Sequence, residues 1–314
     1  CDLYPMKSEI VSSTSSTRAG YVSLVGRPNA GKSTLMNQLI GQKLSIITPK
    51  AQTTWRRLTG IRTTETVQAI FLDTPGLLLP RDLLQRCMLA EALEAVREAD
   101  VMVLLIDATT SLKEAERITI AEVISVTSSP IFVVLNKIDE ASPDGIAALA
   151  QWAASEFGHE VRGISALRGS GLEELWTDLS EALPLAPFLY PEDDISASSV
   201  RYFAAEFIRE TVFEQFREEI PYSVFAVIEE FREDQDPVYI QANLIVERNS
   251  QKGILVGDRG KAIRRLGRTA RKKIQDLMSR PVFLDLWVKV LPNWRQRRGD
   301  LRRLGFRVPT DDDG

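Results

Sequence analysis

Eight consecutive residues near the start of the chain combine two glycines, a lysine and a serine at a fixed spacing. They run Gly26-Arg27-Pro28-Asn29-Ala30-Gly31-Lys32-Ser33, which is the pattern G-x-x-x-x-G-K-S. Glycines at these positions let the backbone wrap closely around an anion, so that successive N–H groups point at phosphate oxygens. The lysine would reach the β- and γ-phosphates, and the serine hydroxyl would bind Mg²⁺. We therefore expect residues 26–33 and the following Thr34 to bind the phosphates of a nucleotide.

Two further segments contain residues that suit a γ-phosphate and a metal ion. In Asp73-Thr74-Pro75-Gly76, the carboxylate can hold Mg²⁺ and the N–H of Gly76 can meet the phosphate. Residues 42–54 are polar and interrupted by proline, so we expect a mobile loop, from which Thr54, or else Thr53, could reach both ligands. The candidates that act on the γ-phosphate are Lys32, Thr54 and Gly76, and the candidate metal ligands are Ser33, Thr54 and Asp73.

A third segment, Asn136-Lys137-Ile138-Asp139, carries a carboxylate that can identify the base. Asp139 can accept hydrogen bonds from guanine N1–H and the 2-amino group together, whereas adenine lacks this pair of donors. We expect Lys137 to lie along the base and Asn136 to tie this loop to the phosphate loop. A later segment, Ser165-Ala166-Leu167, can offer a backbone N–H to guanine O6. The sequence thus predicts binding of GTP and GDP and argues against an ATPase.

Strands that alternate with helices must position these loops. The longest apolar stretches are too short to span a bilayer and suit buried parallel strands. Ligand loops at the ends of successive strands are typical of a doubly wound, mostly parallel α/β sheet, the fold of P-loop GTPase domains. We expect this G domain at residues 19–183, after a disordered extension at residues 1–18. Its expected strands cover residues 21–25, 55–62, 66–72, 101–106, 131–135 and 161–164, and its expected helices residues 33–40, 81–99 and 113–124.

The charge of the chain is distributed unevenly. Residues 248–307 hold 18 Lys and Arg against 4 Asp and Glu, a net charge of +14, whereas the whole chain of 314 residues carries −4. The remainder therefore carries −18. A basic segment in an acidic protein favours a polyanionic partner over a solvated helix face. The cysteines, Cys1 and Cys87, make no disulfide framework, which favours a reducing cytoplasm.

The basic segment includes Gly257-Asp258-Arg259-Gly260, a G-x-x-G loop of the kind that clamps the RNA backbone in KH domains. The surrounding order of helix, two strands, helix pair and strand predicts an α+β type II KH domain at residues 200–307, between a linker at 184–199 and an acidic tail at 308–314. Its expected elements are a helix at 200–216, strands at 223–232 and 238–247, an apolar turn at 253–256, a helix with Ile263 and Leu266, a helix at 269–278 and a strand at 282–290. The candidate RNA-binding residues are Gly257, Asp258, Arg259, Gly260, Lys261, Arg264, Arg265, Arg268, Arg271 and Lys272.

Residues 19–307 resemble the Era family of GTPases, in which a G domain precedes one KH domain. Besides the motifs above, the resemblance rests on Gln52-Thr53-Thr54, Pro221-Tyr222-Ser223-Val224, and residues 283–290 followed by Trp294. It implies that the protein assists maturation of the small ribosomal subunit and that its KH domain grips the 3′ end of small-subunit ribosomal RNA. It also implies that the protein can associate peripherally with the inner membrane. We expect a cytoplasmic monomer without a transmembrane segment.

The chain departs from the family pattern at Trp55, where arginine usually follows the threonine pair, and at Asp258, where a neutral or basic residue is usual. An acid beside phosphates is unfavourable, so we expect Arg259 and Lys261 to dominate the contact with RNA.

The motifs leave the chemistry of hydrolysis open. Leu77, a further candidate nucleotide-binding residue, stands where many small GTPases have a glutamine that orients water, so we expect slow intrinsic hydrolysis. Asn29 either helps to hold a K⁺ ion that supplies positive charge or only stabilises the phosphate loop, and both interpretations have equal weight. The leading function is a GTPase switch that releases RNA on hydrolysis. The alternatives are an RNA-binding scaffold without turnover and a tRNA-modifying GTPase, which would need an extra domain and a reactive terminal cysteine.

Overall fold

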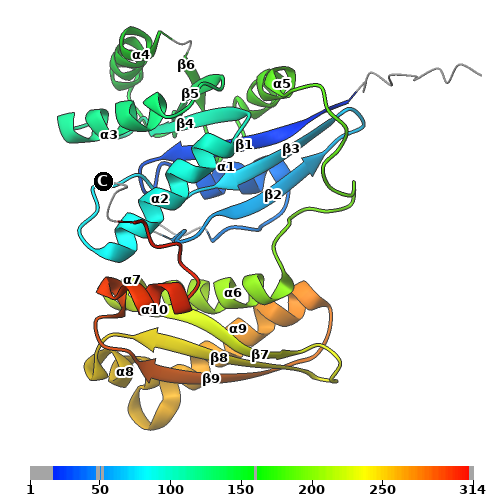
Figure 1. Ribbon diagram of the computed structural model, residues 1–314, viewed down its shortest axis with the longest axis vertical. Helices are drawn as coiled ribbons and strands as arrows, with labels where there is room; N and C mark the ends of the chain where they lie inside the picture. Colours follow the sequence, from blue (N-terminus) through cyan, green and yellow to red (C-terminus); the bar gives the residue numbers. More distant parts are fainter. Residues whose placement is uncertain (1–16, 47–49, 51–52, 159–160, 311–314) are drawn as a thin grey trace, which may run out of the picture.

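Two domains joined by one connection make up the protein (Figure 1). The computed structural model describes residues 17–46, 50, 53–158 and 161–310. The expected disordered extension, except for its last two residues, lies outside the described residues, as do part of the expected mobile loop and the end of the acidic tail. Within the described part of the chain, no helix is both long enough and apolar enough to cross a membrane.

The first domain has a six-stranded sheet in the order β2-β3-β1-β4-β5-β6, with helices on both faces. β2 and β3 pair antiparallel, and the other neighbours pair parallel, as expected for a doubly wound fold. Helices α1 and α5 pack on one face, and α2, α3 and α4 pack on the other. The strands are β1 (Arg18–Gly26), β2 (Leu58–Thr63), β3 (Val67–Asp73), β4 (Val101–Asp107), β5 (Ile131–Asn136) and β6 (Val161–Ile164), and the helices are α1 (Lys32–Ile40), α2 (Leu83–Glu98), α3 (Glu114–Ser125), α4 (Pro143–Phe157) and α5 (Leu172–Ala182).

Burial on both faces explains the composition of the central strands. In β4, every residue before Asp107 is buried, because helices cover both sides of a parallel sheet. The carboxyl ends of parallel strands meet at one edge of the sheet, so the loops after β1, β3, β5 and β6 converge there. α1 ends where Gly41 adopts a left-handed conformation (φ 77°), which lets its N–H bond the carbonyls of the last turn.

Several expected elements of this domain need correction. β2 begins at Leu58, three residues after its expected start, because Trp55 packs against the second domain instead. β1 begins at Arg18, inside the expected extension. α4 and α5 were not predicted, although local signals mark them. Ser142 caps α4 through the N–H of Gly145, and α5 buries Leu172, Leu175 and Leu179 along one face.

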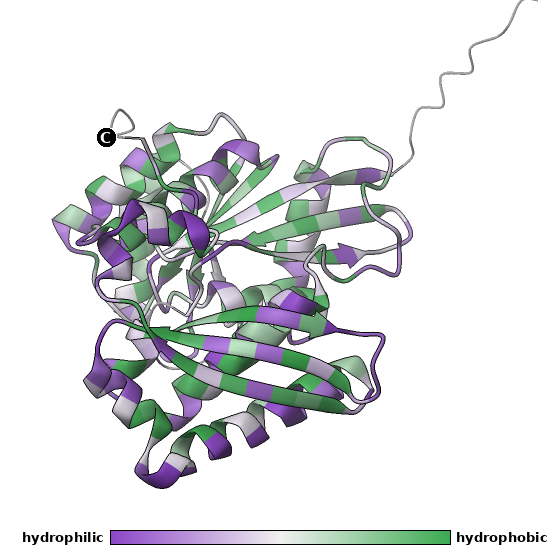
Figure 2. Ribbon diagram, turned by 60° about the horizontal axis from the view of Figure 1, so that its bottom comes forward, coloured by the Kyte–Doolittle hydropathy of each residue, from purple (hydrophilic) through white to green (hydrophobic). Residues whose placement is uncertain are grey.

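The second domain has a three-stranded sheet in the order β7-β8-β9, with α6, α8 and α9 packed on one face. β8 pairs antiparallel with β7 and parallel with β9, and hydrophobic and hydrophilic residues alternate along the strands (Figure 2). The order of elements confirms the expected KH arrangement. The elements are α6 (Val200–Gln215), α7 (Ile220–Ser223), β7 (Phe225–Arg232), β8 (Val238–Val246), α8 (Asn249–Val256), the 3₁₀ turn η1 (Asp258–Gly260), α9 (Lys261–Met278), β9 (Val282–Val290), the 3₁₀ turn η2 (Trp294–Gln296) and α10 (Arg298–Arg303).

Three expectations for the second domain were wrong. Residues 253–256 form the last turn of α8 rather than an apolar turn, because Leu255 is fully buried and the Gln251 side chain accepts hydrogen bonds from the N–H groups of Glu247 and Arg248 at 3.0 Å. The two helices expected after the G-x-x-G loop are the single helix α9. The expected strand 223–232 also begins later, because α7 ends at Ser223.

The expected linker at residues 184–199 follows the edge of the first domain. The side chain of Gln68 accepts hydrogen bonds from the N–H groups of Leu189 and Tyr190 at 2.8 and 2.9 Å, and it donates to the Tyr190 carbonyl at 2.8 Å. Further along, the carbonyl of Ile195 accepts from the N–H of Ile61 at 2.9 Å. The path of the linker is therefore set by hydrogen bonds to β2 and β3.

An apolar cluster joins the two domains. Trp55 stacks on Phe225 of β7, with the ring centroids 5.7 Å apart, and its ring centroid lies 6.1 Å from that of Trp294. An ion pair of 2.6 Å between Arg295 and Asp82 lies beside the cluster. Val308 belongs to the same cluster, so the chain is still packed where we expected the tail to begin. Its buried members are Trp55, Leu84, Cys87 and Met88 from the first domain and Phe225, Ile245, Trp294, Leu301, Phe306 and Val308 from the second.

Removing the fully buried Trp294 side chain should destabilise the protein. Trp294→Ala is expected to lower the free energy of unfolding by about 3–5 kcal/mol, because it leaves a cavity between the domains. Trp287, which is 55% exposed, offers a matched control, and Trp287→Ala should cost at most about 1 kcal/mol. Urea unfolding curves measure both values. Equal losses would contradict the packing of the cluster.

Candidate functional site

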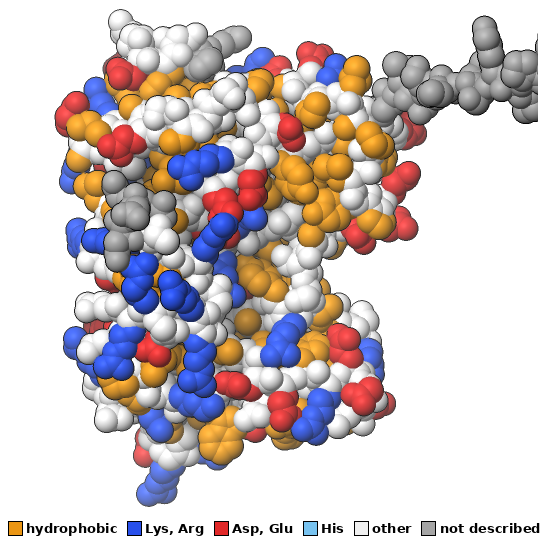
Figure 3. Space-filling model, in the orientation of Figure 1, with side chains coloured by type: hydrophobic (Ala, Val, Ile, Leu, Met, Phe, Trp, Pro, Cys, Tyr) orange, Lys and Arg blue, Asp and Glu red, His pale blue; other side chains and the backbone are white. Residues whose placement is uncertain are grey.

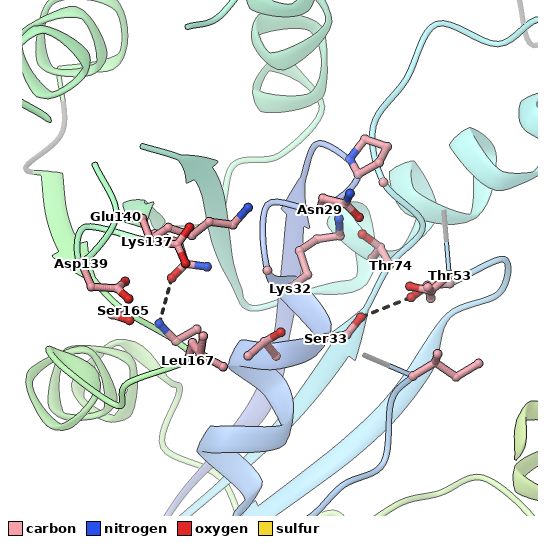
Figure 4. Close-up of a pocket in the computed structure, with 18 residues that line it drawn as sticks. Asn29, Lys32, Ser33, Thr53, Thr74, Lys137, Asp139, Glu140, Ser165 and Leu167 are labelled. Atoms are coloured by element: carbon pink, nitrogen blue, oxygen red, sulfur yellow. Dashed lines mark hydrogen bonds between the residues drawn. The ribbon is translucent and has the colours of Figure 1, made fainter. Parts of the chain in front are cut away.

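A cavity of about 460 Å³ opens at the carboxyl edge of the first domain's sheet. In Figure 4, Asn29, Lys32, Ser33 and Thr74 lie toward one end, and Lys137, Asp139, Ser165 and Leu167 lie toward the other. The structure therefore brings all the predicted nucleotide motifs to one place. The lining residues are Pro28, Asn29, Gly31, Lys32, Ser33, Thr34, Ile46, Thr53, Thr54, Thr74, Gly76, Asn136, Lys137, Asp139, Glu140, Ser165, Ala166 and Leu167.

Lys32 places a buried cation at the first end of the cavity. Its side chain is only 6% exposed, and its ammonium donates hydrogen bonds of 3.0 Å to the carbonyls of Gly26 and Arg27. Burial lowers the pKa of Lys32 to about 8, against an opposing effect of the nearby Asp73 carboxylate. A bound polyphosphate would favour the charged form, so this end of the cavity suits phosphate groups.

Glycine is required at several points around this end. A Cβ atom at Gly26 would lie 2.2 Å from the carbonyl oxygen of Leu105. One at Gly31 would lie 2.1 Å from the Asn136 amide nitrogen, and the φ of Gly31 is 99°. One at Gly76 would lie 2.6 Å from the backbone nitrogen of Pro28, so the segment after β3 contacts the phosphate loop directly.

Three side-chain oxygens converge next to Lys32. The hydroxyl of Ser33 donates to Asp73 Oδ2 at 2.7 Å, and the Thr54 hydroxyl lies 3.3 Å from both. Burial raises the pKa of Asp73, although Lys32 and neighbouring hydroxyls, including Ser45 at 2.9 Å, favour the charged carboxylate. Asp73 Oδ1 is buried and has no hydrogen-bond partner among the described residues. A set of hydroxyl and carboxylate oxygens with an unused oxygen fits Mg²⁺.

Asn136 connects the two ends of the cavity. Its amide donates to the carbonyl of Ala30 in the phosphate loop at 2.8 Å, and its carbonyl oxygen accepts from the N–H of Ala166 at 2.8 Å. Because both groups of one buried side chain are used, the position of the phosphate loop is linked to that of the 165–167 loop. The Asn136 side chain therefore makes the predicted link between the two loops.

Asp139 lies at the far end of the cavity. A hydrogen bond from the Ser165 hydroxyl, with Arg168 as a weaker cause, holds the pKa of this carboxyl below its usual range. Arg168 Nε is 3.6 Å from Asp139 Oδ2. Lys137 lines the cavity too, but its ammonium makes a 2.5 Å ion pair with Asp107. A charged carboxylate at this end suits the paired N–H donors of guanine.

Six predicted nucleotide-binding residues do not line the cavity. Leu77 is buried in the hydrophobic core, so its side chain does not face a ligand. Arg27 pairs with Glu116 at 2.7 Å. Sequence reasoning missed Ile46 and Glu140, because they adjoin the motifs without belonging to a pattern of their own. The other predicted residues outside the lining are Gly26, Ala30, Asp73 and Pro75.

A second hollow of about 470 Å³ lies in the second domain, between α9 and β9. Leu284 and Leu286 of β9 and Ile263 of α9 make it partly apolar. Its basic residues are Arg264, Arg268 and Arg271, three, four or seven residues apart along one face of α9. Apolar and cationic side chains that line one hollow suit the bases and phosphates of single-stranded RNA. We call this hollow the α9–β9 groove.

The G-x-x-G loop lies next to this groove, at the start of α9. The backbone of Arg259 adopts a left-handed conformation (φ 49°). The guanidinium of Arg264 donates hydrogen bonds to the carbonyls of Arg259 and Gly260, which stabilises the loop. Asp258 pairs with Lys261 at 3.0 Å, so this departure from the family pattern engages a cation that we expected to contact RNA.

Two predicted RNA-binding residues of α9 do not line the groove. Arg265 donates to the Gln215 side chain of α6 at 3.2 Å, so it faces α6 and does not line the groove. Lys272 is exposed but lies outside the groove lining. Sequence reasoning missed Ile263, Gly267, Leu284, Asp285 and Leu286, which line the groove.

Fold and site together define a P-loop GTP-binding protein with an attached KH domain. The family model for a 50S ribosome-binding GTPase matches residues 21–137, and that for a KH domain matches residues 219–295. The GTPase Era of Synechocystis sp. is 41% identical over 294 residues, which cover 93% of each chain. The chain belongs to the Era family of GTPases.

Solved structures agree with this assignment. A structure of Aquifex aeolicus Era bound to GDP.AlF4- is 38% identical, with a TM-score of 0.87, and covers 93% of this chain and 100% of that chain. A structure of Era in complex with MgGDPNP and nucleotides 1506–1542 of 16S ribosomal RNA is 37% identical, with a TM-score of 0.88 and the same coverage.

Changing the base-recognition carboxylate should change the preferred nucleotide. Asp139→Asn is expected to weaken GTP binding by at least tenfold and to favour xanthosine triphosphate, because an amide can donate to the xanthine 2-oxo group. Competition binding with the two nucleotides measures the change. Unchanged GTP affinity would remove Asp139 from the base site.

Proposed function

We propose that this chain is a GTPase switch that binds the 3′ end region of small-subunit ribosomal RNA and assists maturation of the small ribosomal subunit. Nucleotide binding is assigned to residues 19–183 and RNA binding to residues 200–307. The observation that carries the proposal is the presence of both a nucleotide cavity and a basic α9–β9 groove in one chain that matches, over 93% of its length, an Era bound to MgGDPNP and ribosomal RNA.

In this proposal, the residues of the cavity have separate tasks. Lys32 and the N–H groups of the phosphate loop neutralise the β- and γ-phosphates, and the N–H of Gly76 contacts the γ-phosphate. Ser33, Thr54 and Asp73 would hold Mg²⁺, which supplies positive charge to the phosphates when it is bound. Asp139 accepts from guanine, and Ser165 keeps its carboxylate charged and oriented.

Hydrolysis by this site is expected to be slow. Leu77 occupies the core, so neither its chemistry nor its position lets it orient an attacking water. A further positive charge near the γ-phosphate would compensate. Asn29 lies in the cavity lining next to the phosphate end, where it could help to hold K⁺. Its left-handed backbone (φ 64°), which asparagine tolerates better than most residues, supports the structural interpretation equally.

The two interpretations of Asn29 predict different salt responses. If Asn29 helps to hold K⁺, GTP turnover should be several-fold faster in K⁺ than in Na⁺ at equal ionic strength, and Asn29→Ala should abolish the difference. Equal rates of GTP turnover by the unsubstituted protein in K⁺ and in Na⁺ would assign Asn29 to loop structure alone.

The RNA partner can be identified directly. We expect that crosslinking in cells, followed by sequencing of the bound RNA, will recover the 3′ end region of small-subunit ribosomal RNA. Arg259→Glu with Lys261→Glu should lower this recovery and weaken RNA binding in vitro by at least tenfold, with a shallower salt dependence, because fewer counterions are released. GTP binding, which uses the other domain, serves as the control. RNA affinity that is unaffected at moderate salt would contradict the KH assignment.

We further propose that the protein is a cytoplasmic monomer that associates peripherally with the inner membrane. This proposal is supported by the resemblance to the Era family.

A further inference from the structure

The loop that carries Thr54 is attached to the second domain, although its hydroxyl belongs to the nucleotide cavity. Thr54 lies 3.3 Å from the side chains of both Ser33 and Asp73. The residues on either side of it, Thr53 and Trp55, contact the second domain. Figure 3 shows the two domains in contact on the left of the view and separated by a notch on the right.

Arg209 of α6 contacts both neighbours of Thr54. Its side chain is 2% exposed, and its guanidinium donates to the carbonyl of Thr53 at 2.9 Å. The same guanidinium lies over the Trp55 ring, 4.6 Å from the centroid, and pairs with Glu206 of its own helix at 2.6 Å. A planar guanidinium can make all three contacts at once, whereas an ammonium cannot.

α6 also holds the loop at two earlier points. Lys43 forms a 2.5 Å ion pair with Glu210, a carboxylate that is almost fully buried. The ammonium of Lys50 donates to the carbonyls of Phe213 and Phe216 near the end of α6, the second at 2.6 Å. One helix of the second domain therefore contacts the loop near its beginning, in its middle and beside Thr54.

Trp55 makes a further contact between the loop and the second domain, and this packing accounts for the departure from the family pattern at this position. Its side chain is buried against Phe225 and Trp294 in the cluster between the domains. The backbone on both sides of Thr54 is thus held by the second domain, through Arg209 before it and the aromatic cluster after it.

We propose that Arg209 is a positioning residue for GTP: by holding the Thr53 carbonyl and the Trp55 ring, it places the Thr54 hydroxyl at the metal and γ-phosphate end of the cavity. The proposal rests on the proposed function of the cavity. It follows that affinity for Mg²⁺ and a nucleoside triphosphate depends on the docked second domain. By thermodynamic reciprocity, the triphosphate strengthens docking of α6 by the same factor. A diphosphate lacks the γ-phosphate and depends on Arg209 much less.

Binding of fluorescent GDPNP with Mg²⁺ and of fluorescent GDP to the full chain tests this role. Arg209→Ala should weaken GDPNP binding about tenfold, the size expected for loss of a hydrogen bond from a charged donor, and should change GDP binding less than twofold. Arg209→Lys, which keeps a charge beside Glu206, should recover only part of the GDPNP affinity. Arg295→Ala removes an ion pair between the domains that does not touch the loop, so it measures the effect of weaker docking alone, and it should lower GDPNP affinity less than Arg209→Ala does.

A double-mutant cycle separates positioning from general stability. In a Thr54→Ala background, Arg209→Ala should weaken GDPNP binding less than twofold, because the two residues act through one contact. Additive losses, or equal losses of GDPNP and GDP affinity in Arg209→Ala or Arg209→Lys, would overturn the proposal. If the unchanged protein binds neither nucleotide, the nucleotide site itself is wrong, and this outcome is distinct from failure of the Arg209 contact alone.

Discussion

Two opposite charges, Lys32 and Asp73, are buried near each other at the phosphate end of the nucleotide cavity, and the site depends on this arrangement. Burial disfavours both charged forms, so the pKa of Lys32 falls to about 8 and that of Asp73 rises. The hydrogen bond from the Lys32 ammonium to a loop carbonyl, and those from the hydroxyls of Ser33 and Ser45 to Asp73, offset the cost of burial only in part. The remaining bonding capacity suits a phosphate group and a metal ion, so the same groups that are costly to bury favour a charged ligand.

Helix α6 connects this site to the α9–β9 groove. On its α9 side, Glu210 pairs with Lys273 at 2.6 Å, and the Gln215 side chain donates to the Thr269 hydroxyl at 3.0 Å. Glu210 also pairs with Lys43 of the first domain, so one buried carboxylate contacts both domains. A displacement of α6 would therefore change contacts at the Thr54 loop and at the helix that lines the groove. This physical connection suits a protein whose nucleotide and RNA sites lie in separate domains.

Much of the fold could be predicted, because its signals are local. β9 matches the expected strand at residues 282–290, and β6 matches that at residues 161–164. Predictions failed where a local signal was misread or a distant contact prevailed. Gly253 made the end of α8 resemble a turn, although burial of Leu255 maintains the helix. Trp55 resembled the start of a strand, but its contact with Phe225 places it outside the sheet.

The sequence by itself determined the class of ligand, because the phosphate loop, the Asp139 carboxylate and the G-x-x-G loop depend on residue types at short spacing. Tertiary structure decided which of the flanking residues take part. It buries Leu77 in the core and turns Arg265 toward α6. It also joins Arg209 to Thr53, which is 156 residues away in the chain. No short-range pattern records such a contact, because it exists only when the two domains pack against each other.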